Sequence, residues 1–245
     1  MPKKIQLKRF KDKSDKFVVK KNNGMFDLPA RLMVCGSSGS GKTQLLLSLL
    51  LSDDAYLNDF EGENIYIWSP MVNDHKLEYL VEKKKIPSLN IFTDYDETLL
   101  SQLYDTLCEE TETEKQLGDM PSQKLIIFDD LGFSGDMANR KQSNNIISKL
   151  MCNSRKHSIS VFSVLQEYFQ MNKTSRLNLT GVCLFNCNNR TLDTVEIEHN
   201  YLKDKNTFKD MVRENLNERH DFIVINYSNN RHQGLYLNKA WEKIG

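Results

Sequence analysis

The residues of this sequence with the clearest chemical potential form one short run, Gly36–Thr43. They follow the pattern G-x-x-x-x-G-K-T, after an apolar run at 32–35 and before a leucine-rich stretch at 44–51. Glycines let the backbone curl so that successive N–H groups point at one anion, and a following helix adds its positive N-terminal end. The spacing therefore predicts a phosphate-binding loop between a buried strand and a helix.

Each residue of this loop has an expected role with a nucleoside triphosphate. The ammonium of Lys42 should reach the β- and γ-phosphates, and the hydroxyl of Thr43 should bind Mg²⁺. ATP with Mg²⁺ is the expected ligand pair. The predicted nucleotide-binding set is Gly36, Ser37, Ser38, Gly39, Ser40, Gly41, Lys42 and Thr43.

Two adjacent acids, Asp129 and Asp130, follow a second apolar run at 124–128. Asp129 stands where the second nucleotide motif, Walker B, places the carboxylate that holds Mg²⁺ opposite Thr43. A second acid beside the metal ligand can polarise the attacking water as a general base. Asp130 therefore favours nucleotide hydrolysis over nucleotide binding alone.

A glutamine, Gln166, ends a third apolar run at 159–165. Its side-chain amide can donate to the γ-phosphate and orient the attacking water, so we expect it to act as a sensor of hydrolysis. The charge that develops on the transferring phosphoryl group also calls for a guanidinium. Arg155 is the first candidate and Arg176 and Arg190 are the others, and the sequence does not choose among them.

Short apolar runs separated by helical patterns predict an α/β fold, with a mainly parallel sheet covered by helices on both faces. Gly36, Asp129 and Gln166 each follow the last apolar residue of a predicted strand. Since ligands of such sheets bind at the carboxyl ends of the strands, these three positions should converge at one edge. The apolar runs at 222–227 and 235–237 predict a C-terminal β-hairpin. The other predicted strands are 64–68, 89–92 and 181–185.

Apolar spacing also predicts several helices. Asp94 and Glu97 resemble a capping box at the start of a long helix that runs to about Lys115, with an apolar stripe beginning at Leu99 and Leu100. The stretch from 191 to 218 should hold two helices. The remaining predicted helices are 73–84 and 139–153.

The charges are balanced overall, with 33 basic and 33 acidic residues, which gives no global nucleic-acid signature. Nine Lys/Arg lie between Lys3 and Lys21, so residues 1–24 are expected to form a basic N-terminal arm, either a solvated tail or a nucleic-acid contact. Residues 25–245 should form the nucleotide-hydrolysing domain. The loops at 133–141 and 168–176 combine basic and aromatic residues and are candidate DNA contacts or ordinary surface loops.

The five cysteines are odd in number and contain no C-x-x-C, which favours reduced thiols over a disulfide framework. Cys183 and Cys187 have C-x-x-x-C spacing without a second ligand pair, so zinc binding stays open. No apolar run approaches the roughly 20 residues of a membrane span, and no signal peptide is visible. We expect a soluble, intracellular protein without a membrane partner.

Three segments together resemble a known family. RLMVCGSSGSGKT, LIIFDD and SRKHSISVFSVLQ are similar to the poxvirus-type DNA-packaging ATPases of the FtsK/HerA superfamily, which occur in large double-stranded DNA viruses and their virophages. The layout is most similar to the virophage branch, and the resemblance runs from about Gly24 to Leu237.

This resemblance implies a RecA-like P-loop NTPase of the ASCE type, working as a homo-oligomeric ring that translocates double-stranded DNA into a viral capsid. It places such a protein in the virion or the host cytoplasm. By resemblance, Asp130 is the catalytic acid and Gln166 the sensor, while the arginine comes from a neighbouring subunit and matches Arg155 or Arg190 only weakly. Many members of the superfamily carry Glu where Asp130 stands, so the attacking water must lie closer to the backbone here.

Two other classes of function remain open at this point. A different P-loop enzyme is one, but a GTPase should carry N-K-x-D, and the nearest stretches, 172–175 and 238–241, lack the Asp. A small-molecule kinase should carry an arginine-rich lid, which the sequence does not show. A nucleotide-gated scaffold or DNA-binding protein is the other, suggested by the basic arm.

Overall fold

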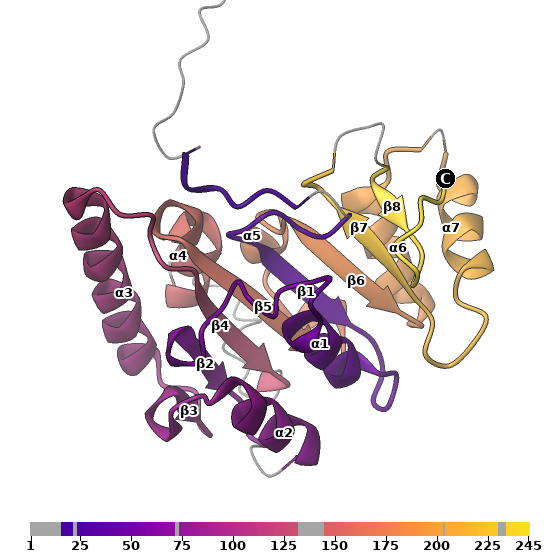
Figure 1. The fold of residues 1–245 in the computed structure, drawn as a ribbon. Coiled ribbons are helices and arrows are strands. Elements are labelled where there is room, and N and C mark those ends of the chain that lie inside the picture. Colours follow the sequence, from indigo (N-terminus) through magenta and orange to yellow (C-terminus); the bar gives the residue numbers. More distant parts are fainter. Residues whose placement is uncertain (1–15, 22–23, 72–73, 132–144, 203, 230–233) are drawn as a thin grey trace, which may run out of the picture.

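A computed structural model of the chain describes residues 16–21, 24–71, 74–131, 145–202, 204–229 and 234–245. Its centre is an eight-stranded sheet in the order β3-β2-β4-β5-β1-β6-β7-β8 (Figure 1). The first six strands in this order are parallel, whereas β7 and β8 each pair antiparallel with the strand before them. The strands are β1 (Arg31–Cys35), β2 (Ile65–Trp68), β3 (Ile91–Phe92), β4 (Lys124–Asp129), β5 (Ile159–Leu165), β6 (Gly181–Phe185), β7 (Phe222–Asn226) and β8 (Tyr236–Leu237).

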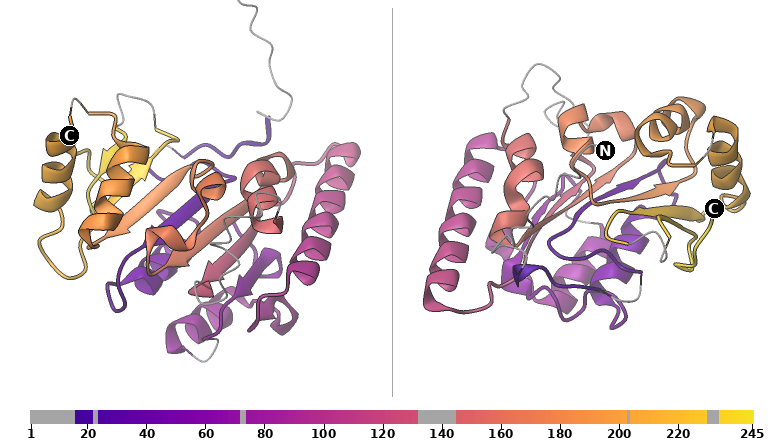
Figure 2. Two further views of the ribbon diagram at one scale, coloured as in Figure 1. Left: turned by 180° about the vertical axis from the view of Figure 1, so that it is seen from behind. Right: turned by 90° about the horizontal axis from the view of Figure 1, so that it is seen from above.

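Helices cover both faces of this sheet (Figures 1 and 2). Successive strand residues point to opposite faces, so in β1 the side chain of Leu32 joins one apolar core and that of Met33 joins the other. The core with Leu32 is closed by α1 and α2, and the core with Met33 by α3, α4, α6 and α7. The helices are α1 (Lys42–Leu51), α2 (His75–Lys84), α3 (Glu97–Leu117), α4 (Ile146–Asn153), α5 (Lys173–Arg176), α6 (Asn189–His199) and α7 (Lys205–Glu214).

The fold confirms the predicted α/β class, the mainly parallel sheet and the C-terminal hairpin, which is formed by β7 and β8. The predicted third strand is shorter than expected. Ser88–Asn90 forms a 3₁₀ turn and Leu89 is 85% exposed, so only Ile91–Phe92 pairs with β2. The first part of the predicted helix 139–153 lies outside the described residues, and α4 accounts for the rest.

The start of α3 differs from the prediction. Asp96, not Asp94, is the N-cap, and its carboxylate accepts from the backbone N–H groups of Thr98 and Leu99. The helix therefore begins two residues later, and its buried stripe starts at Leu100, whereas Leu99 is 37% exposed. Either acid suits a cap, so the local sequence does not choose between them.

The strand order positions the site. Strand β5 lies between β4 and β1, with Asp129 opposite Val164 and Cys35 opposite Leu165. The residues that follow these three strands therefore emerge side by side at the carboxyl edge of the sheet. Within the described part of the chain, no helix combines the length and the apolar character that a membrane crossing requires.

Candidate nucleotide-binding and hydrolysis site

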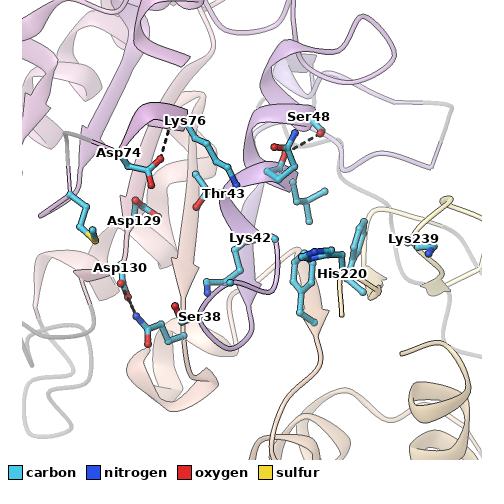
Figure 3. Close-up of a pocket in the computed structure, with 18 of the residues that line it drawn as sticks. Ser38, Lys42, Thr43, Ser48, Asp74, Lys76, Asp129, Asp130, His220 and Lys239 are labelled. Carbon is cyan, nitrogen blue, oxygen red and sulfur yellow. Dashed lines mark hydrogen bonds between the residues drawn. The ribbon is translucent and has the colours of Figure 1, made fainter. Parts of the chain in front are cut away.

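A cavity of about 760 Å³ opens at the carboxyl ends of β1, β4 and β5 (Figure 3). This volume is in the range of small-molecule sites. Its wall includes the predicted residues Lys42, Thr43, Asp129, Asp130 and Gln166. The structure thus brings together side chains that are more than a hundred residues apart in the sequence.

The loop between β1 and α1 is held in the shape that an anion site needs. The Gly36 N–H donates to Leu165 O at 3.2 Å, which keeps the start of the loop on the sheet. Gly39 and Gly41 have φ values of 71° and 110°, in the left-handed region that favours glycine. A Cβ on Gly36 would lie only 2.5 Å from Cβ of Phe185 on β6. The glycines of the motif are therefore required by backbone shape and by close packing.

Lys42 begins α1 and folds back over this loop. Its ammonium donates to Gly36 O at 2.7 Å and to Ser37 O at 3.0 Å. Burial lowers the pKa of Lys42, while the negative charges of Asp130 and Asp129 oppose that shift. The cation is thus held at the mouth of the loop, close to the N-terminal end of the helix.

Asp129 is buried at the end of β4, with a hydrogen-bond partner that sequence reasoning missed. The Ser69 hydroxyl, just after β2, donates to Asp129 Oδ2 at 3.0 Å. Burial raises the pKa of Asp129 to about 6, the Ser69 hydrogen bond lowers it, and the charge of Asp130 raises it. One signal for Ser69 was present, because it follows a parallel strand adjacent to β4 just as Asp129 follows β4 itself.

The metal-binding prediction fits the donor groups that are present. Thr43 and Asp129 line the same part of the cavity and contribute a hydroxyl and a carboxylate (Figure 3). Such oxygen ligands suit Mg²⁺, which is usually bound through one or two protein groups together with substrate phosphates.

Asp130 and Gln166 form a direct pair. The Gln166 amide donates from Nε2 to both carboxylate oxygens of Asp130, at 3.0 and 2.7 Å. Asp130 has φ of 52°, an uncommon backbone conformation outside glycine that Asp tolerates better than most residues, and its N–H donates to Val164 O at 3.0 Å. The predicted catalytic acid and the predicted sensor are therefore already coupled.

The segment that carries Gln166 is fixed by a capping box. Gln170 Oε1 accepts from the backbone N–H groups of Gln166 and Glu167, at 2.9 and 3.0 Å. This closes the short 3₁₀ turn Tyr168–Gln170 directly after the sensor.

None of the three candidate arginines, Arg155, Arg176 and Arg190, is among the described residues that line this cavity. Arg155 precedes β5 and so lies at the amino edge of the sheet, opposite Gln166. Arg176 is buried and forms an ion pair with Glu198 at 2.7 Å. Arg190 stacks on Phe169, with its guanidinium 4.6 Å from the ring centroid.

The structure also limits two open predictions. In the loop 168–176, Tyr168 and Arg176 are buried, so they are not accessible DNA contacts, and the loop 133–141 lies outside the described residues. Cys183 is buried in β6, and burial raises the pKa of Cys187 to about 11. Within the described ranges, no three His, Cys, Asp or Glu side chains form a metal-binding group.

Several residues at the cavity were absent from the sequence-based site. His220 Nδ1 lies 3.0 Å from Ser40 O in the phosphate loop, and Arg219 lies against Gly39. Lys239 and Trp241 reach the cavity from the end of the chain. No sequence pattern marked them, since their proximity to the loop arises only from the position of β7 and β8 in the sheet.

The family model described as "Poxvirus A32 protein" matches residues 17–236. The chain belongs to this family. That match spans nearly the whole described chain, including every predicted site residue, and confirms the resemblance to poxvirus-type packaging ATPases. No curated protein matches the sequence.

Solved structures share the fold of this A32-family chain. The genome packaging NTPase B204 from Sulfolobus turreted icosahedral virus 2, in complex with sulfate, aligns with a TM-score of 0.53 and 12% identity, covering 81% of this chain and 91% of that chain. B204, the DNA-packaging ATPase from Sulfolobus turreted icosahedral virus, aligns with a TM-score of 0.51 and 12% identity, covering 82% and 93%. The family and the fold together support a genome-packaging ATPase.

Proposed function

We propose that this A32-family chain is an ATP-hydrolysing motor that translocates double-stranded DNA into a viral capsid. The observation that supports ATP hydrolysis, and not ATP binding alone, is the hydrogen-bonded pair of Asp130 and Gln166 beside the phosphate loop. B204, which shares the fold, has been solved with AMPPCP and with ATP-γS. Residues 25–245 act as the motor domain. The basic arm 1–24, of which residues 1–15, 22 and 23 lie outside the described part of the chain, is a candidate DNA contact or a solvated tail.

Each side chain has a role in this reaction. Lys42 leaves the loop carbonyls to neutralise the β- and γ-phosphates, and the loop N–H groups hold the phosphate oxygens. Thr43 and Asp129 would hold Mg²⁺, which would neutralise charge on the phosphates. Ser69 fixes the orientation of the Asp129 carboxylate.

Asp130 and Gln166 act on the water. As water attacks the γ-phosphorus and the bond to ADP breaks, the Asp130 carboxylate takes the proton that the water loses. Gln166 exchanges its bond to Asp130 for one to the water or the γ-phosphate, so that its position reports the state of the nucleotide. Gln170 and the turn behind it transmit that change.

The proposed mechanism needs a neighbouring subunit, as a ring of identical chains provides. A guanidinium at the γ-phosphate comes from a neighbouring subunit, and Arg155 remains our first candidate, since it sits on the far edge of its own sheet. A homo-oligomeric ring around double-stranded DNA, docked on a capsid in the virion or the host cytoplasm, completes the proposal. The virophage branch is the proposed lineage.

Phosphate release from ATP, measured with and without double-stranded DNA, tests the enzymatic part. We expect DNA to stimulate turnover, and Lys42→Ala to lower it by at least about a hundredfold because it removes the phosphate cation. Lys83→Ala is the matched control, since Lys83 lies on α2 over the ring of Tyr79 and outside the cavity. Unchanged turnover in Lys42→Ala contradicts the proposal. Tight nucleotide binding without phosphate release favours a nucleotide-gated scaffold instead.

A further inference from the structure

The cavity extends well beyond its phosphate and metal end. In Figure 3, His220 and Lys239 lie on the opposite side of Lys42 from Asp129 and Asp130. At that end the wall is built from β6, β7 and the last residues of the chain. Its aromatic residues are Phe185, His220, Phe222 and Trp241.

These rings are packed and have defined orientations. The centroids of Phe185 and Phe222 lie 5.1 Å apart with their planes tilted by 42°. The half-buried indole of Trp241 meets Phe26 edge to face, at 5.7 Å and 77°. Aromatic faces in a concave site favour a flat π ligand.

The backbone at Trp241 is strained. Its φ of 63° lies in the left-handed region, which is a genuine outlier for a bulky residue. A compact turn enforces it, because Trp241 N donates to Asn238 O at 2.9 Å and the Asn238 side chain accepts from the N–H groups of Ala240 and Glu242. Strain of this kind persists where the surroundings over-determine a conformation, often at ligand sites.

His220 is tied to the phosphate loop. Its Nδ1 lies 3.0 Å from Ser40 O of that loop. The neighbouring Asp221 braces the segment 217–221, because its carboxylate accepts from the Asn217 and Glu218 N–H groups and from Lys239 Nζ at 2.6 Å. The ring of His220 is therefore held beside the phosphate loop.

We propose that this aromatic end is a nucleobase subsite that holds its base by stacking on Trp241 and His220 and discriminates weakly between adenine and guanine. The inference rests on the proposed function for the triphosphate. The acceptor that suits guanine best is one carboxylate that accepts from both its N1–H and its N2–H₂ group. Among the described residues of the wall, the carboxylates are those of Asp74, Asp129 and Asp130, at the metal end. Stacking is tolerant of base identity, because every base presents a π face.

Titration calorimetry with three probes tests this subsite: non-hydrolysable analogues of ATP and of GTP, and inorganic tripolyphosphate, each with Mg²⁺. In the intact chain, we expect the two purine analogues to bind within about tenfold of each other. We expect Trp241→Ala to weaken both analogues about tenfold or more, and to leave tripolyphosphate affinity within about twofold. His220→Ala also removes the contact with Ser40 O of the phosphate loop, so we expect it to weaken tripolyphosphate as well, but to weaken the two purine analogues about tenfold more. Tyr79→Ala removes an exposed aromatic side chain from α2, outside the cavity, and is the matched control.

A fluorescence readout covers the case in which Trp241→Ala fails to fold. The chain has two tryptophans, and Trp68 is fully buried against Phe92, so Trp241 should respond to a stacked base. The purine analogues should quench the emission of the intact chain, tripolyphosphate should not, and Trp241→Phe should abolish the response.

The proposal is overturned if both variants lose affinity for tripolyphosphate as much as for the purine analogues. It is also overturned if the intact chain binds one purine analogue more than about a hundredfold more tightly than the other. Failure of the proposed function looks different, because tripolyphosphate itself would then bind equally well to the intact chain and to Lys42→Ala.

Discussion

At the residue scale, the site is a set of charged groups held near one another before any ligand arrives. Asp129 is 8% exposed and lies beside Asp130, and the charge of Asp74 also acts on it, so three carboxylates share one end of the cavity with lysines. Such an arrangement suits a cation and a polyphosphate and is costly without them. Function and stability therefore oppose each other at Asp129, which can be measured.

Asp129→Asn should stabilise the nucleotide-free chain at neutral pH. Burial raises the pKa of Asp129 from 3.8 to about 6, so ionisation costs stability as the pH rises through that window. We expect a gain of up to about 3 kcal/mol at pH 7.5 and almost none at pH 4, measured by thermal or urea unfolding. Exposed Asp53→Asn is the control and should change stability at neither pH. Equal stability of Asp129→Asn and the parent chain at pH 7.5 would show that the carboxylate is not strained.

Asp130→Asn should separate binding from hydrolysis. The amide preserves the size of the side chain and its contact with Gln166 but cannot take a proton, so we expect turnover to fall by at least about a hundredfold. Affinity for a non-hydrolysable ATP analogue should stay within a few fold. A variant that still turns over ATP at the parent rate would assign the general base elsewhere.

At the element scale, three adjacent parallel strands and the turns after them do the positioning. The apolar runs of β1, β4 and β5 are nearly continuous because both faces of these strands are buried, and this made them visible in the sequence. Parallel strands end at the same carboxyl edge of a sheet, so the residues that directly follow these strands are expected to lie close together there. The phosphate loop, the paired acids and Gln166 were predictable for that reason.

Other features depend on tertiary contacts that no local pattern encodes. Asp96, and not Asp94, caps α3, although both acids suit a cap. The hydrogen bond from Ser69 to Asp129 and the approach of His220 to the phosphate loop join residues 60 and 180 positions apart. Ser69 had one sequence signal, its place directly after a predicted strand, but its partner Asp129 and the approach of His220 follow only from the fold.

Gln170 offers a test of an element that positions the sensor. Gln170→Ala removes the acceptor for the N–H groups of Gln166 and Glu167 and should loosen the turn after β5. We expect kcat to fall about tenfold with little change in KM, since the phosphate loop is untouched. Gln102→Ala on the exposed side of α3 is the matched control. A change in KM alone would mean that the turn contributes to binding and not to catalysis.

At the scale of the whole molecule, one chain supplies the phosphate loop, the proposed metal ligands and the proposed water-positioning pair, but the candidate arginines lie elsewhere. A neighbouring copy would complete the site if the amino edge of its sheet, which carries Arg155, faced this cavity.

Subunit mixing tests the shared site. Arg155→Ala and Lys42→Ala should each be nearly inactive alone. We expect Arg155→Ala to lower ATP turnover by about a thousandfold. Mixed in equal amounts, they should regain part of the turnover, because an intact phosphate loop from one variant meets an intact arginine from the other. A second mixture combines Lys42→Ala with Arg190→Ala. If this mixture regains turnover and the mixture with Arg155→Ala does not, the shared arginine is Arg190. Full activity of Arg155→Ala alone excludes it.

The central claim is that hydrolysis moves double-stranded DNA, and displacement of a third strand from a DNA triplex measures that movement most directly. The intact chain with ATP and Mg²⁺ should release the third strand at a rate that follows ATP turnover. Asp130→Asn should bind the same DNA and ATP and release no strand. Strand release by Asp130→Asn, or DNA-stimulated hydrolysis in the intact chain without any release, would contradict the account.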